Sequence, residues 1–194
     1  MTETEQRTAV ITQVYRVYIK ASPQAIWDAI TNPEWTERYG YGGRVEYDLR
    51  PGGAVRGLTS DAMKMQGAAM GVEVPDVAIE GEVIEADPPR RLVQTFHMVM
   101  DPELAAERVT RLTYEIEEGK GGATRLTLIH ELEGAPKLAA VLSGAMEDQG
   151  AGGGWSWVLS DLKSLLETGR SFDQYGTGSV QSAPHRDHGD RRVR

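Results

Sequence analysis

The chain has 194 residues and no cysteine, which suits one domain with tails and excludes disulfides, zinc–thiolate sites and thiol chemistry. Its formal net charge of −8 disfavours nucleic-acid binding, because an acidic surface repels phosphate backbones. The polar, acidic start MTETEQRTAV is unlike a secretory signal, and the longest uncharged apolar stretch, near 138–146, is much shorter than the roughly 20 residues of a membrane span. We therefore expect a cytoplasmic protein without a membrane span.

The first predicted elements are one strand and two short helices. Residues 10–20 are rich in β-branched and aromatic side chains, which predicts a strand. A Ser-Pro pair at 22–23 supplies an N-cap and a proline at the first helical position, so a helix is expected through Ile30. An Asn-Pro pair at 32–33 repeats this signal and predicts a second short helix, which ends at the glycines that follow Tyr39.

A series of strands joined by turns follows. Strands are expected at 44–49, 54–59, 77–86, 91–98, 109–117 and 124–132. Turn signals such as Pro-Gly-Gly at 51–53 and Asp-Pro-Pro at 87–89 separate most of them. Successive strands with short connections imply an antiparallel sheet.

The last predicted element is a helix over 154–168, whose apolar side chains, Trp155 and Leu159 among them, form one stripe that should face a core. The order of elements indicates an α+β domain over 10–170, in which an antiparallel sheet of six or seven strands curves around this helix. Because one helix is too narrow to cover such a sheet, we expect a cavity between them. Residues 1–9 are expected to be a flexible lead-in, and 171–194 a disordered tail.

Several stretches carry a family resemblance: ASPQAIWDAITNPEWTERY, RPGGAV, GEVIEADPPRRLVQTF, RLTYEIEEGKGGATRLTLIHE and GGWSWVLSDLKSLLETG. With them the chain resembles the START-like (SRPBCC) superfamily, and within it the branch named after the activator of the ninety-kilodalton heat-shock-protein ATPase. The resemblance implies the helix-grip fold over about residues 10–170. Lipid carriers, polyketide cyclases and co-chaperone domains share that fold, so it does not fix an activity. Two departures, a long segment at 60–76 and Gln94 in place of the usual aromatic, would alter the pocket.

The segment 60–76 contains three methionines, Met63, Met65 and Met70. Methionine is flexible and polarizable and suits adaptable apolar surfaces. The segment therefore predicts either a lid over the cavity mouth or an irregular loop or extended hairpin packed on the sheet.

Alternation along the strands gives the other candidate wall residues. Gln94, Phe96 and Met98 share one face of a strand, and polar tips on an apolar wall are typical of a small-molecule site, although the same residues could form plain core. Trp35 and Tyr39 could rim the entrance or hold the short helices to the sheet. The complete set expected at the ligand site is Trp35, Tyr39, Met63, Met65, Met70, Gln94, Phe96, Met98, Leu112, Tyr114, Leu128, His130, Trp155 and Leu159.

His130 alternates with leucines and should share their side of the sheet. If that side is concave, the imidazole could orient a ligand or act as an acid or base. The alternative is a core histidine hydrogen-bonded to a neighbour. Trp157 falls on the opposite face of the last helix, where it could mark a partner surface or lie under the tail.

The function that these patterns favour is binding of a small apolar molecule, without a catalytic residue, a metal or a cofactor. One alternative is an enzyme of the cyclase or dehydratase type that polarises a carbonyl with His130, Tyr114 or Gln94. Another is a co-chaperone-like module that recruits a protein partner through Trp157 or the tail. The sequence leaves the oligomeric state open.

Overall fold

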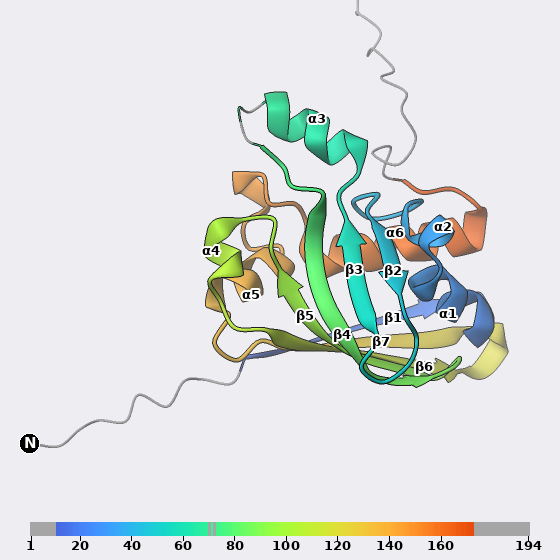
Figure 1. The fold of residues 1–194 in the computed structure, drawn as a ribbon. Helices are drawn as coiled ribbons and strands as arrows, with labels where there is room; N and C mark the ends of the chain where they lie inside the picture. The colour runs from blue at the N-terminus through green and yellow to red at the C-terminus, as the bar shows by residue number, and fades with distance from the viewer. Residues whose placement is uncertain (1–10, 70, 72, 173–194) are drawn as a thin grey trace, which may run out of the picture.

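The protein is built on a seven-stranded antiparallel sheet with the strand order β1-β7-β6-β5-β4-β3-β2 (Figure 1). The computed structural model describes residues 11–69, 71 and 73–172, so the expected lead-in and nearly all of the expected tail lie outside the described residues. The strands are β1 (Thr12–Ile19), β2 (Arg44–Tyr47), β3 (Ala54–Leu58), β4 (Val77–Asp87), β5 (Arg91–Met98), β6 (Thr110–Glu118) and β7 (Thr124–Glu131). The helix-grip architecture expected from the sequence is confirmed.

The helices are α1 (Pro23–Thr31), α2 (Pro33–Thr36), α3 (Asp61–Ala69), α4 (Pro102–Ala105), α5 (Pro136–Leu142) and α6 (Gly154–Thr168), with short 3-10 turns at Lys120–Gly122 and Glu147–Gln149. The two predicted caps are present, since the Ser22 hydroxyl accepts from the Ala25 amide and the Asn32 side chain accepts from the Glu34 amide. Both short helices after the first strand therefore start where the sequence indicates. None of the helices in the described part of the chain is long and apolar enough to cross a membrane.

Helix α3 differs from the irregular loop or hairpin that was one interpretation of segment 60–76. Its composition explains the helix, because Ala, Met, Lys and Gln are strong helix formers. The Ser60 hydroxyl accepts a hydrogen bond from the Met63 amide at 3.2 Å and so satisfies one amide of the first turn. Figure 1 shows α3 beyond the ends of β3 and β4, away from the main body of the sheet.

Irregular pairing bends the sheet. The register shifts between Gly57 and Leu58 where β3 meets β4, and between Val83 and Glu85 where β4 meets β5. Such bulges kink a strand and increase its twist. At Gly81, a Cβ atom would lie 2.2 Å from the Thr95 carbonyl oxygen, so only glycine permits the close approach of β4 to β5. The concave surface that results faces α6.

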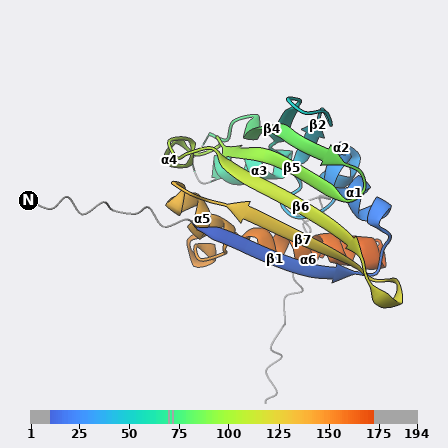
Figure 2. The ribbon, with the colours of Figure 1, turned by 90° about the horizontal axis from the view of Figure 1, so that it is seen from below.

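Helix α6 runs along the β1 side of this curved sheet, which it contacts (Figure 2). The predicted apolar stripe is buried, since Leu159, Leu162 and Leu165 are each at most 5% exposed. Below it lie the leucines of β7, including Leu126 and Leu128. The core therefore concentrates between α6 and the β1–β7 edge of the sheet.

A buried carboxylate on α6 ties two loops to the helix. Asp161 is fully buried, and its Oδ2 accepts hydrogen bonds from the Gly40 amide at 2.8 Å and the Ser171 hydroxyl at 2.7 Å. Its Oδ1 accepts from the Phe172 amide at 2.8 Å. Gly40, with φ of +64°, occupies the left-handed region at this junction. Asp161 thus fixes both the loop after α2 and the chain that follows α6.

Replacing Asp161 with alanine should lower the free energy of unfolding by about 2–4 kcal/mol, because buried amides would lose their acceptor. Denaturant unfolding followed by circular dichroism would measure this change. The control is Asp148→Ala, at an exposed position, for which we expect a change within about 0.5 kcal/mol. Equal effects of the two substitutions would show that Asp161 does not hold the loops.

Candidate functional site

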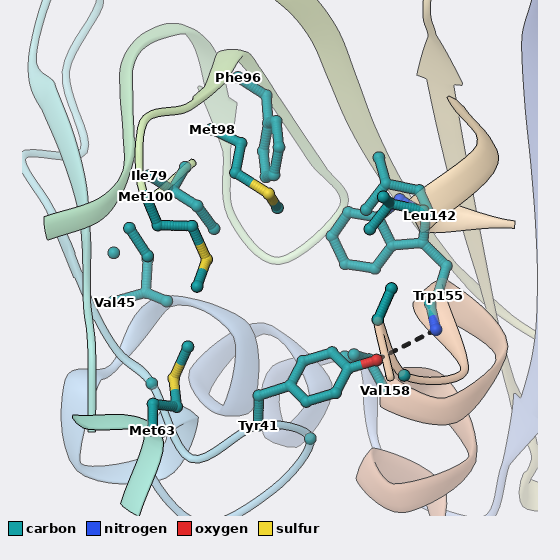
Figure 3. Close-up of a pocket in the computed structure, with 18 of the residues that line it drawn as sticks. Tyr41, Val45, Met63, Ile79, Phe96, Met98, Met100, Leu142, Trp155 and Val158 are labelled. Atoms are coloured by element: carbon teal, nitrogen blue, oxygen red, sulfur yellow. Dashed lines mark hydrogen bonds between the residues drawn. The ribbon is translucent and has the colours of Figure 1, made fainter. Parts of the chain in front are cut away.

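A cavity of about 800 Å³ lies between the concave face of the sheet and the N-terminal part of α6 (Figure 3). Strands β2 to β6 contribute to its wall, whereas no described residue of β1 or β7 does. Helices α3 and α5 also contribute. The wall is mainly apolar and includes Val45, Val55, Ile79, Phe96, Met98, Met100, Leu142, Trp155 and Val158. A volume of this size is typical of small-molecule sites.

The side chains converge from opposite sides of this space. Figure 3 shows Met98 and Met100 pointing toward the same volume as Trp155. Tyr41 lies at the side of α6, where its hydroxyl accepts a hydrogen bond from the Gly154 amide at 3.0 Å. That contact satisfies an amide at the start of α6, which lacks a capping side chain of its own.

Many of the residues expected at the ligand site lie together in this wall: Tyr39, Met63, Gln94, Phe96, Met98, Leu112, Tyr114 and Trp155. Leu128 and Leu159 do not line the cavity and belong to the core beneath α6. Trp35 lies outside the wall as well, with the Arg38 guanidinium 4.5 Å from its ring centroid. It packs beside the short helices instead of rimming the entrance.

The methionines of segment 60–76 separate because the segment is helical. Met63 lines the cavity, whereas Met65 is 74% exposed and outside the wall. Residues two apart on a helix point in different directions, so they cannot contribute to one surface. Met70 lies outside the described residues.

His130 is on the concave side, as its alternation with leucines predicted, but it lies behind the cavity wall. It is fully buried and not part of the cavity lining. The Trp155 indole N–H donates to its Nδ1 at 3.2 Å, and because indole nitrogen only donates, the His130 proton must be on Nε2. Nε2 then donates to the Thr110 hydroxyl at 2.8 Å, and that hydroxyl donates to the Phe96 carbonyl at 2.9 Å. The interpretation of His130 as a cavity group is therefore corrected to a hydrogen-bonded core histidine.

Burial lowers the pKa of His130 to about 3, so the ring is neutral at physiological pH. Phe96 packs against it edge-on, with ring centroids 5.0 Å apart, and Trp155 lies 6.0 Å away. Both aromatic neighbours belong to the cavity wall. His130 therefore positions the Phe96 and Trp155 side chains of the wall and does not itself line the cavity.

The polar groups of the wall gather around Gln94. This side chain is 2% exposed, and its Oε1 atom has no hydrogen-bond partner in the described part of the chain. Tyr39, Tyr47 and Tyr114 also line the cavity. Burial raises the pKa of all three phenols, and hydrogen bonding by Gln94 partly offsets this rise in the pKa of Tyr47. The cavity thus contains neutral hydrogen-bonding groups inside an apolar wall.

A model of the family described as Activator of Hsp90 ATPase homolog 1-like protein matches residues 20–167, most of the chain. The chain belongs to this family. The match confirms the branch of the START-like superfamily that the sequence stretches indicated. No curated protein sequence matches the chain.

Solved structures with low sequence identity to this chain share its fold. The protein encoded by gene BPP1335 of Bordetella parapertussis is 20% identical, covering 85% of this chain and 78% of that one, with a TM-score of 0.58. PFC0360w, an HSP90 activator from Plasmodium falciparum, is 18% identical over 80% of this chain and 96% of that one, with a TM-score of 0.53. The Aha1 dimer from Colwellia psychrerythraea is 16% identical over 83% and 99%, respectively, with a TM-score of 0.52.

Four charged residues are among the described residues of the cavity lining: Glu73, Asp101, Lys137 and Glu147. Lys137, the one cationic residue among the described lining residues, bonds to Asp101 at 3.4 Å and to Glu103. The Glu107 carboxylate accepts from the Lys137 and Leu138 amides at 2.8 Å each and so caps α5. The described residues include no group of three or more His, Asp or Glu that could hold a metal ion.

Sequence reasoning missed Tyr47, Asp161 and the wall contributed by α5. Tyr47 was part of an expected strand, and its alternation with Val45 could have placed both on the concave face. Residues 136–142 carry a proline followed by apolar residues at helical spacing, which could have predicted α5. Asp161 left no signal, because an acidic residue beside an apolar helical stripe is usually solvated.

Stability should fall as pH decreases below 6.5, because the unfolded state then protonates His130 while the folded state resists until about pH 3. For His130→Gln this contribution is absent, so the stability difference between wild type and variant should shrink by about 1.4 kcal/mol per pH unit between pH 6 and 4. Denaturant unfolding at several pH values would measure it. At pH 8 the variant should be less stable, since Trp155 and Thr110 lose their partner. Parallel pH profiles would contradict the neutral, buried ring.

Proposed function

We propose that the protein binds a small, mainly apolar molecule in the cavity between the sheet and α6, without a chemical step. The observation that carries the proposal is the volume of about 800 Å³ with a predominantly apolar wall. Membership of a START-like family, in which a cavity recurs, supports it. Apolar surface that moves from water into such a space gains free energy in proportion to its area.

The expected strength of binding follows from the area. A two-ring aromatic molecule that buries roughly 250 Å² of apolar surface gains about 6 kcal/mol before the costs of association. Without those costs the gain would correspond to a Kd of about 40 μM, and the costs shift the Kd toward the millimolar range. The cavity volume admits larger molecules, so a natural ligand with more apolar surface would bind more tightly. Met63, Met98 and Met100 could adapt the wall to its shape.

Binding is preferred to the cyclase-like alternative because of where His130 lies. That alternative needs polar groups that converge on a ligand and can exchange protons near neutral pH. His130, its strongest candidate, is outside the cavity and satisfied by Trp155 and Thr110. Gln94 and Tyr114 remain in the wall, but neither is an acid or base near neutral pH.

A co-chaperone-like role has its support in the family description and in the likeness to an HSP90 activator. The surface around Trp157, which the sequence indicated for a protein partner, is less exposed than that role requires. Trp157 packs edge-on against Phe172, with ring centroids 5.0 Å apart, and contributes to the cavity wall. The Trp157 side chain is half-buried. Its surroundings match the second expectation, that it lies under the chain after α6, better than an open partner surface. Ligand binding therefore remains the preferred proposal.

Wild-type protein should bind the neutral probe N-phenyl-1-naphthylamine, with a rise in probe fluorescence. Met98→Glu should weaken this binding about tenfold or more, because a ligand would have to desolvate a carboxylate on the wall. Met65→Glu is the matched control, since Met65 is exposed outside the cavity, and its affinity should equal that of wild type. Fluorescence titration measures both.

Circular dichroism and denaturant unfolding would verify that each variant is folded. A wild-type protein that does not bind the probe, or equal affinities for the two variants, would contradict binding in this cavity.

A further inference from the structure

The Gln94 amide is the unusual group in the cavity wall. It is 2% exposed, it lines the cavity, and its Oε1 atom is without a hydrogen-bond partner among the described residues. A buried amide oxygen without a partner lowers stability, because the oxygen has given up its bonds to water. An apolar side chain of the same size would avoid that loss. The amide therefore points to a partner that is not among the described residues.

The neighbours of Gln94 in the sheet cannot supply that partner. Gln94 pairs with Val83 on β4 and with Leu112 on β6, and both neighbours have apolar side chains. Phe96, next along the same face of β5, is apolar as well. From β2, Tyr47 hydrogen-bonds the Gln94 amide, and because this bond lowers the pKa of Tyr47, it is the amide N–H that donates it. Oε1 is therefore left to the cavity side, where a group that donates a proton can satisfy it.

Tyrosine hydroxyls provide a second contact on the same side. Leu92 pairs with Tyr114 on β6, so Tyr114 lies diagonally across from Gln94 on the same face. Its hydroxyl forms no hydrogen bond within the described part of the chain, whereas the Tyr39 hydroxyl donates to the Ala29 carbonyl. A phenol donates one hydrogen bond and accepts others, so Tyr114 can donate to a ligand oxygen.

The electrostatics of the cavity select a neutral partner. Lys137 is the one cationic residue among the described lining residues, and it is already bonded to Asp101 and Glu103. Burial also raises the pKa of Tyr114, which reflects the cost of negative charge in this part of the protein. A carboxylate or phosphate ligand would find no counter-ion beside Gln94.

We infer that the cavity takes a neutral apolar molecule with a hydroxyl group, and that this hydroxyl donates to Gln94 Oε1 and accepts from Tyr114 Oη. Phenols and ring alcohols are the chemical class that fits, because one hydroxyl can form both bonds. This inference rests on the proposed function and deepens it. It assigns Gln94 as the residue that sets specificity.

Three matched ligands test the inference: biphenyl-4-ol, 4-methoxybiphenyl and 4-methylbiphenyl. They share one apolar body and differ in whether the end group donates and accepts, only accepts, or does neither. Their affinities would be measured by displacement of N-phenyl-1-naphthylamine and, for each variant, corrected for the affinity of that probe. Wild type should prefer biphenyl-4-ol over both others by about tenfold or more.

Two variants assign the preference to residues. Gln94→Met keeps the length of the side chain and removes the amide, so the preference for biphenyl-4-ol should fall to about threefold or less, and 4-methylbiphenyl should bind at least as well as in wild type. Its stability should match or exceed that of wild type, because an unpaired buried oxygen is gone. Tyr114→Phe should reduce the preference in part and leave the affinity for 4-methylbiphenyl unchanged.

The outcomes separate the inference from the function on which it rests. If wild type binds all three ligands equally, or binds 4-methoxybiphenyl as well as biphenyl-4-ol, the hydroxyl assignment is overturned while cavity binding stands. The assignment is also overturned if Gln94→Met retains the full preference. If neither the fluorescent probe nor any of the three ligands binds, the proposed function fails first.

Discussion

The hydrogen bond from the Trp155 indole to His130 Nδ1 decides where α6 begins relative to the sheet. His130 is itself held by Thr110, so the contact joins α6 to β7 and, through the Thr110 hydroxyl, to β6 and β5. About 1.7 turns later, Asp161 attaches α6 to the loop after α2 and to the chain that follows the helix. The contact between Trp155 and His130 places the start of α6 over β7, and α6 leaves the concave surface of β2 to β6 uncovered. The cavity exists because the helix is fixed at one side of a sheet that is wider than the helix.

Polar groups divide into two kinds according to their partners. Those that hold α6, such as His130 and Asp161, are buried and have partners within the protein, as stable cores require. Gln94, which lines the cavity, differs, since its buried Oε1 atom has no partner in the described residues. Departures from local rules of this kind are expected at functional sites, where stability is lowered for the sake of binding. The contrast is what separates the framework of the protein from its candidate site.

The sequence predicted the framework well because its signals are local. Backbone geometry explains each of these signals: the Ser-Pro cap, the Asn-Pro cap, the alternation along the strands and the apolar stripe of 154–168. Helix α3 was not predicted, because its apolar residues form no clear one-sided stripe, although Ala, Met, Lys and Gln favour a helix. Helix α5 was missed because its apolar stretch is short.

The candidate site was predictable only in part. Alternation along a strand tells which side of the sheet a side chain is on, but not whether other side chains separate it from the cavity. His130 faces the side predicted for it, yet Trp155 and Phe96 lie between it and the cavity. Leu128 is hidden for a similar reason, since α6 covers β7. Alternation along the strands was enough to predict Gln94 and Tyr114 in the wall. That Gln94 Oε1 has no partner among the described residues depends on tertiary packing, which cannot be read from one sequence.

The most direct test of an unfilled space beside α6 is a crystal structure determined under xenon pressure. Xenon enters apolar cavities that side chains do not fill, without needing a hydrogen bond or a charge. The account predicts ordered xenon between β5 and α6, in contact with Phe96, Met98 or Trp155. A structure in which these side chains meet across the gap, with no xenon inside, would contradict it.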